Sequence, residues 1–213
     1  MLAAARQVLA EKGFADTTIE EITHRAEFGK GTLYNYFPGG KEEILLAVVS
    51  DLYDGLSGLV ERSFAADAGL PARDQFRHFM ARVFAYFTER RELFLILMKE
   101  AHRMGFSGDG ERVRFYLAQR EKVAAALLVP IRAAIESGQM RPLPPDAIVH
   151  MLLGNIQGLQ MQLALQSTGS ACDARTWSSE EASSIVTTIL FDGLLTDLAR
   201  HEPGSIPGVD THV

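Results

Sequence analysis

Residues 30–37 read Lys-Gly-Thr-Leu-Tyr-Asn-Tyr-Phe, and this stretch with its neighbours decides the fold. Helical spacing places Leu33 and Phe37 on one face and the polar side chains on the other. So short a helix is not stable alone in water, so its apolar face must pack on neighbouring helices. Pro38-Gly39-Gly40 ends the segment, because proline and glycine interrupt helical backbone.

Two helices are expected ahead of this stretch. Their apolar faces carry Leu2, Ala5 and Leu9 in the first and Ile19, Ile22 and Ala26 in the second. The first should end at Gly13, because glycine readily takes the left-handed conformation that follows many helices. The second opens at Thr17-Thr18 with two overlapping capping boxes, in which a hydroxyl accepts a backbone N–H while Glu20 or Glu21 reaches back. A break at residues 27–29 then separates it from residues 30–37.

The rest of the chain also has helical apolar spacing, and no stretch alternates as a strand does. Helices are expected over residues 41–64, 76–87, 94–101, 111–137 with a kink at Pro130, 146–166 and 180–200. Ser178 with Glu181 makes a cap for the last of these. The predicted fold is therefore all-α, with a three-helix unit at residues 1–48, a larger helical body at 49–200 and a flexible tail at 201–213.

Bulk composition narrows the class of protein. The chain has 213 residues, of which 47% are hydrophobic and 23% charged, a profile typical of a compact fold with its own core. Its net charge of -6 argues against non-specific coating of nucleic acid, so any DNA contact must be local. The single cysteine, Cys172, cannot form an internal disulfide. The sequence also shows no signal peptide, and no apolar run approaches the roughly 18 residues of a membrane span. These three features predict a cytoplasmic protein with no membrane partner.

The polar face of residues 30–37 has the chemistry of a DNA reader. Two short helices joined by a tight break form a helix-turn-helix, whose second helix lies in the major groove. Thr18 begins a helix, where backbone N–H groups favour a phosphate. Lys30 can bind phosphate or guanine, and Thr32 can reach a base edge, whereas Tyr34 and Tyr36 can donate hydroxyls to phosphates. The alternative is a packed aromatic turn, but a core segment would not normally expose so many polar groups.

These residues resemble the N-terminal domain of TetR-type repressors over about residues 2–48. The resemblance rests on Gly13-Phe14, Thr17-Thr18, Ile22, residues 30–37 and Lys41-Glu42-Glu43-Ile44. It implies DNA contacts at Thr18, Lys30, Thr32, Tyr34, Tyr36 and Lys41. The sequence departs from the family pattern in three places: residues 27–29 replace the usual turn of Gly, a small aliphatic residue and Ser, residues 38–40 are one residue longer, and the chain starts directly in the first helix without a basic arm.

The resemblance also implies a ligand-binding and dimerisation role for the body. The expected function is a repressor that binds a near-palindromic double-stranded DNA operator as a homodimer and is released by a small, largely apolar effector. Phe84, Met98, His102, Phe115 and Met161 are the predicted walls of the effector site, with Gln157 and Gln160 as orienting polar groups. Ordinary core packing is the alternative for the Phe- and Met-rich stripes.

The helix over residues 146–166 carries two glycines four positions apart, and small residues at this spacing let helices approach closely. A crossing within one chain and a seam between subunits are both consistent with this pattern. Because the family pairs its last two helices into an intersubunit four-helix bundle, we favour the seam. The predicted dimer interface consists of Gly154, Gly158, Leu163, Val186, Leu190 and Leu194.

An enzyme is the competing class. The sequence has no G-x-S-x-G, G-x-G-x-x-G, H-E-x-x-H or C-x-x-C motif, and Gly40-Lys41 is followed by Glu and not by the Ser or Thr of a phosphate-binding loop. His102 and His150 lack a second His or Cys at ligand spacing. We therefore predict no catalytic residue, no metal and no cofactor. An all-helical dimer that has lost DNA binding and an unrecognised small-molecule enzyme remain as alternatives.

Overall fold

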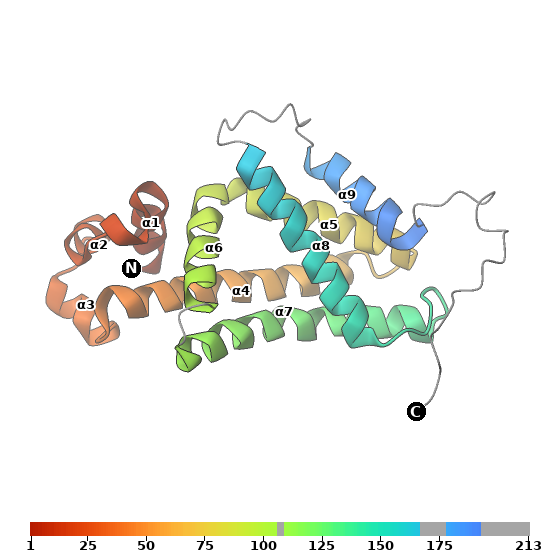
Figure 1. Cartoon of the computed structure of the whole chain (residues 1–213), viewed down its shortest axis with the longest axis horizontal. Coiled ribbons are helices and arrows are strands. Elements are labelled where there is room, and N and C mark those ends of the chain that lie inside the picture. Colours follow the sequence, from red (N-terminus) through yellow and green to blue (C-terminus); the bar gives the residue numbers. More distant parts are fainter. Residues whose placement is uncertain (106–108, 167–177, 193–213) are drawn as a thin grey trace.

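A computed structural model describes residues 1–105, 109–166 and 178–192 (Figure 1). Every regular element in these ranges is helical, which confirms the all-α prediction. The helices are α1 (Leu2–Asp16), α2 (Ile19–Ala26), α3 (Lys30–Tyr36), α4 (Gly40–Ala66), α5 (Ala72–Glu89), α6 (Arg91–Gly105), α7 (Gly110–Glu136), α8 (Pro145–Gln166) and α9 (Ser179–Thr187), which continues as a π-helical turn at Thr188–Asp192. Residues 193–200 of the last predicted helix and the predicted tail at 201–213 lie outside the described residues.

The helix ends follow the local sequence signals. Gly13 interrupts the backbone of α1 with a φ of 78°, in the left-handed region that glycine tolerates. Of the two overlapping capping boxes predicted for α2, the one formed joins Thr18 to Glu21, whereas the Thr17 hydroxyl donates to the Gly13 carbonyl at 2.6 Å. α9 begins with the predicted box of Ser178 and Glu181. Pro130 lies inside α7 and does not end it.

The helices are arranged around the long α4 (Figure 1). α1, α2 and α3 pack together at one end of the molecule, and α4 runs from this end into the body beside α5 and α7. α6 contacts both α1 and α7, so it bridges the N-terminal helices and the body. α8 packs on α7, and α9 packs on α5. None of the described helices combines the length and apolarity needed to cross a bilayer.

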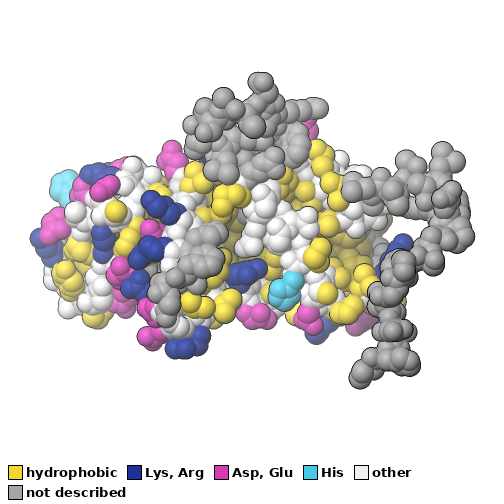
Figure 2. All heavy atoms as spheres, in the orientation of Figure 1, with side chains coloured by type: hydrophobic (Ala, Val, Ile, Leu, Met, Phe, Trp, Pro, Cys, Tyr) yellow, Lys and Arg dark blue, Asp and Glu magenta, His cyan; other side chains and the backbone are white. Residues whose placement is uncertain are grey.

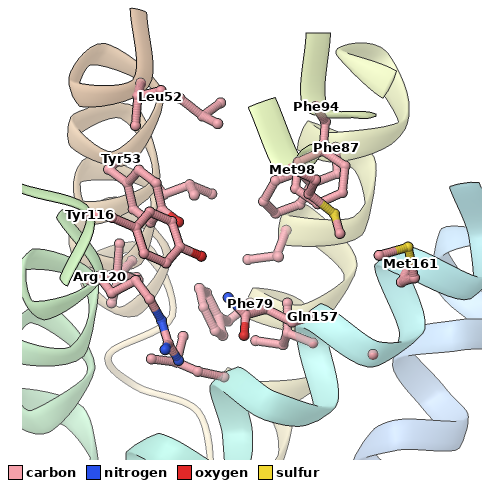
Figure 3. A pocket seen from close by; sticks show the side chains of 18 residues that line it. Leu52, Tyr53, Phe79, Phe87, Phe94, Met98, Tyr116, Arg120, Gln157 and Met161 are labelled. Atoms are coloured by element: carbon pink, nitrogen blue, oxygen red, sulfur yellow. The ribbon is translucent and has the colours of Figure 1, made fainter. Parts of the chain in front are cut away.

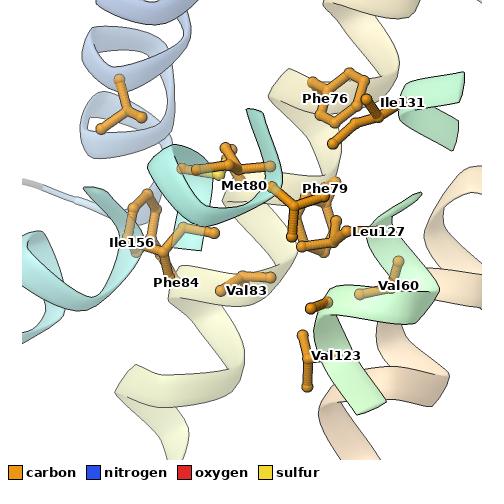
Figure 4. Close-up of a cluster of buried hydrophobic side chains, with 14 of the residues drawn as sticks. Val60, Phe76, Phe79, Met80, Val83, Phe84, Val123, Leu127, Ile131 and Ile156 are labelled. Carbon is orange, nitrogen blue, oxygen red and sulfur yellow. The ribbon is translucent and has the colours of Figure 1, made fainter. Parts of the chain in front are cut away.

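Two clusters of buried side chains stabilise this arrangement. The N-terminal core consists of Ala5, Val8, Leu9, Ile22, Leu33, Ile44, Leu45, Val48, Val49, Leu52 and Leu93. The body core gathers aromatic and aliphatic side chains of α5, α7, α8 and α9, among them Phe76, Phe79, Met80, Leu127 and Ile156 (Figure 4). α4 supplies Ile44 to Leu52 to the first cluster and Val60 to the second. One continuous helix therefore connects both cores.

Candidate DNA-binding surface and effector cavity

α3 is held to the protein by one buried side chain. Leu33 has no exposed surface and is the one buried residue of this seven-residue helix. Gly29 begins α3 as its N-cap without a side-chain hydrogen bond, and the Leu33 N–H donates to the Gly29 carbonyl at 3.2 Å. Before it, Glu27 takes a left-handed backbone conformation with a φ of 56°. The sharp turn from α2 into α3 thus forms although the sequence there departs from the family pattern.

The polar side of α3 faces solvent. Thr32, Tyr34 and Tyr36 are exposed, and the two tyrosines keep 48% and 70% of their surface. Thr18 is also exposed: its hydroxyl accepts the Glu21 N–H, and its own N–H donates to the Glu21 carboxylate. These groups can therefore reach a DNA duplex without any rearrangement of the core.

Acidic side chains balance the basic ones around this surface. Lys12 pairs with Glu21, Arg25 with Glu11 and Lys30 with Glu20. The hydrogen bond from Lys30 is the main cause that lowers the pKa of Glu20, so that carboxylate stays charged beside α3. Because the Lys30 pair is well exposed, it is only weakly stabilising and can exchange for a phosphate. The positive field for DNA must come from local placement of these cations, as the net charge suggested.

Lys41 occupies a different environment from the other predicted DNA contacts. Its ammonium group donates to the backbone carbonyls of Phe14 at 2.9 Å and Ala15 at 3.1 Å, and it lies 4.7 Å from the centre of the Phe14 ring. These bonds attach the start of α4 to the end of α1. One of the three ammonium protons is left for a phosphate, so a DNA contact by Lys41 remains a prediction.

The body contains a cavity of about 450 Å³ between α4, α5, α6, α7 and α8. Figure 3 shows its walls, which are mostly aliphatic and aromatic. Its volume falls in the usual range for small-molecule sites, roughly 300–1,000 Å³. Of the predicted wall residues, Met98 and Met161 line it, and so does the predicted orienting residue Gln157. The side chains of His102 and Gln160 lie outside the described residues.

Two of the predicted wall residues, Phe84 and Phe115, do not line this cavity, because each lies one helical position away from a residue that does. Phe84 is buried in the body core beside Ile156, whereas Phe79, Val83 and Phe87 form the stripe of α5 that lines the cavity (Figure 4). Phe115 packs against the N-terminal core, and its neighbour Tyr116 lines the cavity instead. Adjacent helical residues point about 100° apart, so an error of one position moves a side chain to another face.

Three polar lining residues were missed by the sequence prediction: Tyr53 on α4, and Tyr116 and Arg120 on α7. The two tyrosine rings meet edge to face with their centres 6.2 Å apart. The signal that could have revealed them is the spacing of Tyr116, Arg120, Val123 and Leu127, which puts an arginine on the apolar stripe of α7. An arginine at such a position is uncommon unless it has a partner.

The cavity and the N-terminal core share residues of α4 and α6. Val49 and Leu52 of α4 belong to the N-terminal core and also line the cavity. On α6, Leu93 packs into the N-terminal core while Phe94 and Met98 line the cavity. A molecule that fills the cavity would therefore press on side chains that support the helix-turn-helix.

Charged contacts add a second connection at the far end of α6. Glu42, in the first turn of α4, is 3.3 Å from Arg112 at the start of α7 and 3.9 Å from Arg103 near the end of α6. The Arg103 guanidinium also lies 5.5 Å from the centre of the Phe14 ring on α1. A displacement of α6 relative to α4 would change these contacts.

An apolar surface lies over α8 and α9. Met151, Ile185 and Ile189 keep 65%, 36% and 41% of their surface exposed. On the face shown in Figure 2, this region is largely hydrophobic or uncharged, whereas charged side chains of both signs gather over the N-terminal helices. A side chain added at Gly154 or Gly158 would meet nothing within 4 Å in the described chain. Another helix could pack closely on this exposed apolar surface, because the two glycines beside it have no side chain and no neighbour in the way.

The predicted interface residues of α9 need a correction. Val186 is buried in the body core of its own chain, and Leu190 packs partly against the same core. Ile185 of α9 and Ile189 of the π-helical turn that follows it, one position earlier in each case, are exposed instead. The side chain of Leu163 and the whole of Leu194 lie outside the described residues. Within the described ranges, no group of three or more His, Cys, Asp or Glu residues could hold a metal ion.

Comparison with known proteins defines the class. Residues 1–48 match the family of bacterial regulatory proteins of the tetR family. Two uncharacterised helix-turn-helix regulators of Bacillus subtilis are similar: YerO, 30% identical over 95 residues, and YuxN, 35% identical over 54 residues. These alignments cover 44% and 25% of this chain but only 32% and 18% of the relatives, so the chain matches about a third or less of their length.

Solved structures share the fold over nearly the whole chain. PfmR, a TetR-family regulator of Thermus thermophilus, is 23% identical with a TM-score of 0.63, covering 92% of this chain and 98% of its own. FadR of Bacillus subtilis, solved in complex with stearoyl-CoA, is 18% identical with a TM-score of 0.73, covering 91% and 97%. At these identities the two structures show what the fold of the chain resembles. Residues 1–48 thus resemble the N-terminal domain of the tetR family, and the fold of the chain resembles that of a TetR-family regulator.

Proposed function

We propose that the chain is a ligand-responsive repressor, which binds a near-palindromic operator as a homodimer and is released when a small, largely apolar effector fills the cavity. The observation that carries this proposal is the double role of α4 and α6, whose side chains line the cavity and also pack into the N-terminal core. Residues 1–48 act as the DNA-binding domain and residues 49–200 as the effector and dimerisation domain. A repressor of this kind acts where its DNA lies, so the proposal includes a cytoplasmic location.

The effector acts by preferring one arrangement of α4 and α6 over another, because a ligand shifts an equilibrium only through such a difference in affinity. Complete switching, from 1:99 to 99:1, takes roughly 5.5 kcal/mol of preference, and partial release takes less. The complex of FadR with stearoyl-CoA supports the idea that this fold can bind a ligand with a long apolar chain. The mainly aliphatic and aromatic walls of the cavity support it for this chain.

DNA recognition by α3 is tested with two substitutions of exposed side chains. We expect Thr32→Ala to relax base preference, by about 1–3 kcal/mol at the affected position, because Thr32 can reach a base edge. Tyr34→Phe removes a hydroxyl expected on phosphate, so it should weaken binding to all sequences alike. The measurement is fluorescence anisotropy with the preferred duplex and single-base variants of it. Equal loss on every duplex for Thr32→Ala would contradict a base contact.

Dimerisation through α8 and α9 is tested at Gly154. This glycine is exposed and does not line the cavity, unlike Gly158. Since a new side chain at Gly154 has open space in the monomer, Gly154→Leu should leave the monomer fold intact and block close approach of the partner helix. We expect sedimentation to show a shift from dimer to monomer at low micromolar concentration. Ala125→Leu, at an exposed position of α7, is the matched control and should stay dimeric.

A further inference from the structure

The polar groups of the cavity are collected on one side. Tyr53 of α4, Tyr116 and Arg120 of α7 and Gln157 of α8 lie together there, whereas Phe87, Phe94, Met98 and Met161 lie opposite (Figure 3). The cavity is thus divided into a part with hydrogen-bond donors and a part without them. A ligand that matches both parts has one polar end and one apolar end.

Arg120 is the only charged residue of this lining, and it has no counter-ion within the described ranges. It forms no salt bridge or hydrogen bond with any residue described there. Asp54, an acidic residue of α4 on the side that faces α7, is already paired with Lys122 at 2.7 Å. Glu121, next to Arg120 in sequence, is exposed to solvent. Arg120 is therefore half-buried in the cavity lining without a compensating anion among the described residues.

The neighbours of Arg120 add donors and no negative charge. Burial raises the pKa of Tyr53 far above its usual value, with a further contribution from Tyr116, so the Tyr53 hydroxyl keeps its proton. A protonated phenol donates a hydrogen bond, and the Gln157 amide can donate as well. Donors around an unpaired guanidinium favour a ligand group with several acceptor oxygens and a negative charge. Arginine binds a carboxylate through two parallel hydrogen bonds, which are stronger than neutral ones.

We propose that the effector is an amphipathic carboxylic acid, whose carboxylate binds Arg120 while its apolar chain or ring fills the side of the cavity lined by Phe87, Phe94 and Met98. This inference rests on the proposed role of the cavity as the effector site. A coenzyme A thioester lacks this free carboxylate, since its acyl carbonyl is neutral. With its acyl chain in the apolar part, such a ligand would bring a neutral carbonyl to the polar part, because its anionic phosphates lie much farther along the molecule. The structure thus favours the free acid over the thioester.

The test measures binding of matched ligands to the full-length protein by isothermal titration calorimetry, below their micelle concentrations. The probes are dodecanoic acid with dodecanol, cinnamic acid with cinnamyl alcohol, and dodecanoyl-CoA. We expect one acid at least to bind about ten- to a hundredfold more tightly than its alcohol. Arg120→Gln should remove this preference and leave the affinity for the alcohol unchanged. Arg132→Gln, at an exposed position of the same helix, should retain the preference.

The other outcomes separate this inference from the proposed function. Equal binding of acid and alcohol, or an acid preference that survives Arg120→Gln, would contradict the binding of an effector carboxylate by Arg120. Either result would still leave the cavity as an effector site. If dodecanoyl-CoA bound most tightly and Arg120→Gln left its affinity unchanged, the effector would be a thioester and not a carboxylic acid, and the cavity would remain its site. Failure of every probe to bind would count against the cavity as the effector site, and so against both proposals. Thermal unfolding of each variant checks that the Arg120 substitution leaves the fold intact.

Discussion

Replacing Leu33 by Ala is expected to lower the free energy of unfolding by about 2–5 kcal/mol, the usual range for truncating a fully buried leucine. The same substitution is expected to abolish operator binding. Leu33 is fully buried and is the one side chain that fixes α3 in the N-terminal core. Its loss removes apolar contacts and leaves a cavity under a helix too short to persist alone. The measurements are urea denaturation followed by circular dichroism and anisotropy with operator DNA.

The matched control is Asn35→Ala, at an exposed position of the same helix. It should change the free energy of unfolding by less than about 0.5 kcal/mol, because exposed substitutions away from caps and cores have small effects. If Leu33→Ala unfolded at the same urea concentration as the wild type and still bound the operator, α3 would not depend on this anchor.

Filling the cavity with Met98→Trp is expected to weaken effector binding about ten- to a hundredfold while operator binding persists. Met98 lines the cavity from α6, next to Phe94 and Phe87. A larger ring there takes the volume that the apolar part of the effector would use, and overpacking typically costs about 1–3 kcal/mol. The variant should therefore repress without responding. The response is measured as release of operator DNA on addition of effector.

Lys99→Trp is the control for this experiment, because Lys99 is exposed on the same helix. It should respond as the wild type does. Loss of operator binding in Met98→Trp would show that α6 transmits the filling of the cavity even without effector. A normal response in Met98→Trp would mean that the effector binds elsewhere.

The helices and their ends could be predicted from the sequence because their causes are local. The capping box of Thr18 and Glu21, the break at Gly13 and the anchor Leu33 each depend on residues a few positions apart. Such short-range signals depend little on how the helices pack against one another. The N-terminal surface could also be anticipated, since a short helix with one apolar face must expose the other.

The cavity could be predicted only in part, because its walls depend on how five helices rotate against one another. Apolar spacing identified the stripes of α5 and α6 but could not say which of two adjacent stripes faces a void and which packs in the core. Phe84 and Phe115 were placed in the wall for this reason, although each packs in a core one helical position away from a lining residue. Arg120 was overlooked because it is one of four arginines of α7, and arginine side chains usually lie in solvent.

Lys41 shows a further limit of prediction from the sequence. Family resemblance placed its ammonium on a phosphate, whereas in the structure it donates to the carbonyls of Phe14 and Ala15. Those carbonyls follow the interruption of α1 at Gly13, and their position depends on how α1 and α4 pack. A contact between segments so far apart in sequence leaves no local pattern.

The most direct test of the central claim is a selection of the wild-type protein against a library of random DNA duplexes at moderate salt. Two α3 helices related by two-fold symmetry should enrich an inverted repeat, with half-site centres about 34–36 Å or one helical turn apart. Enrichment of such a repeat is the result we expect. A library that returns no enriched sequence, or only an asymmetric single half-site, would contradict a dimeric regulator that reads its operator through α3.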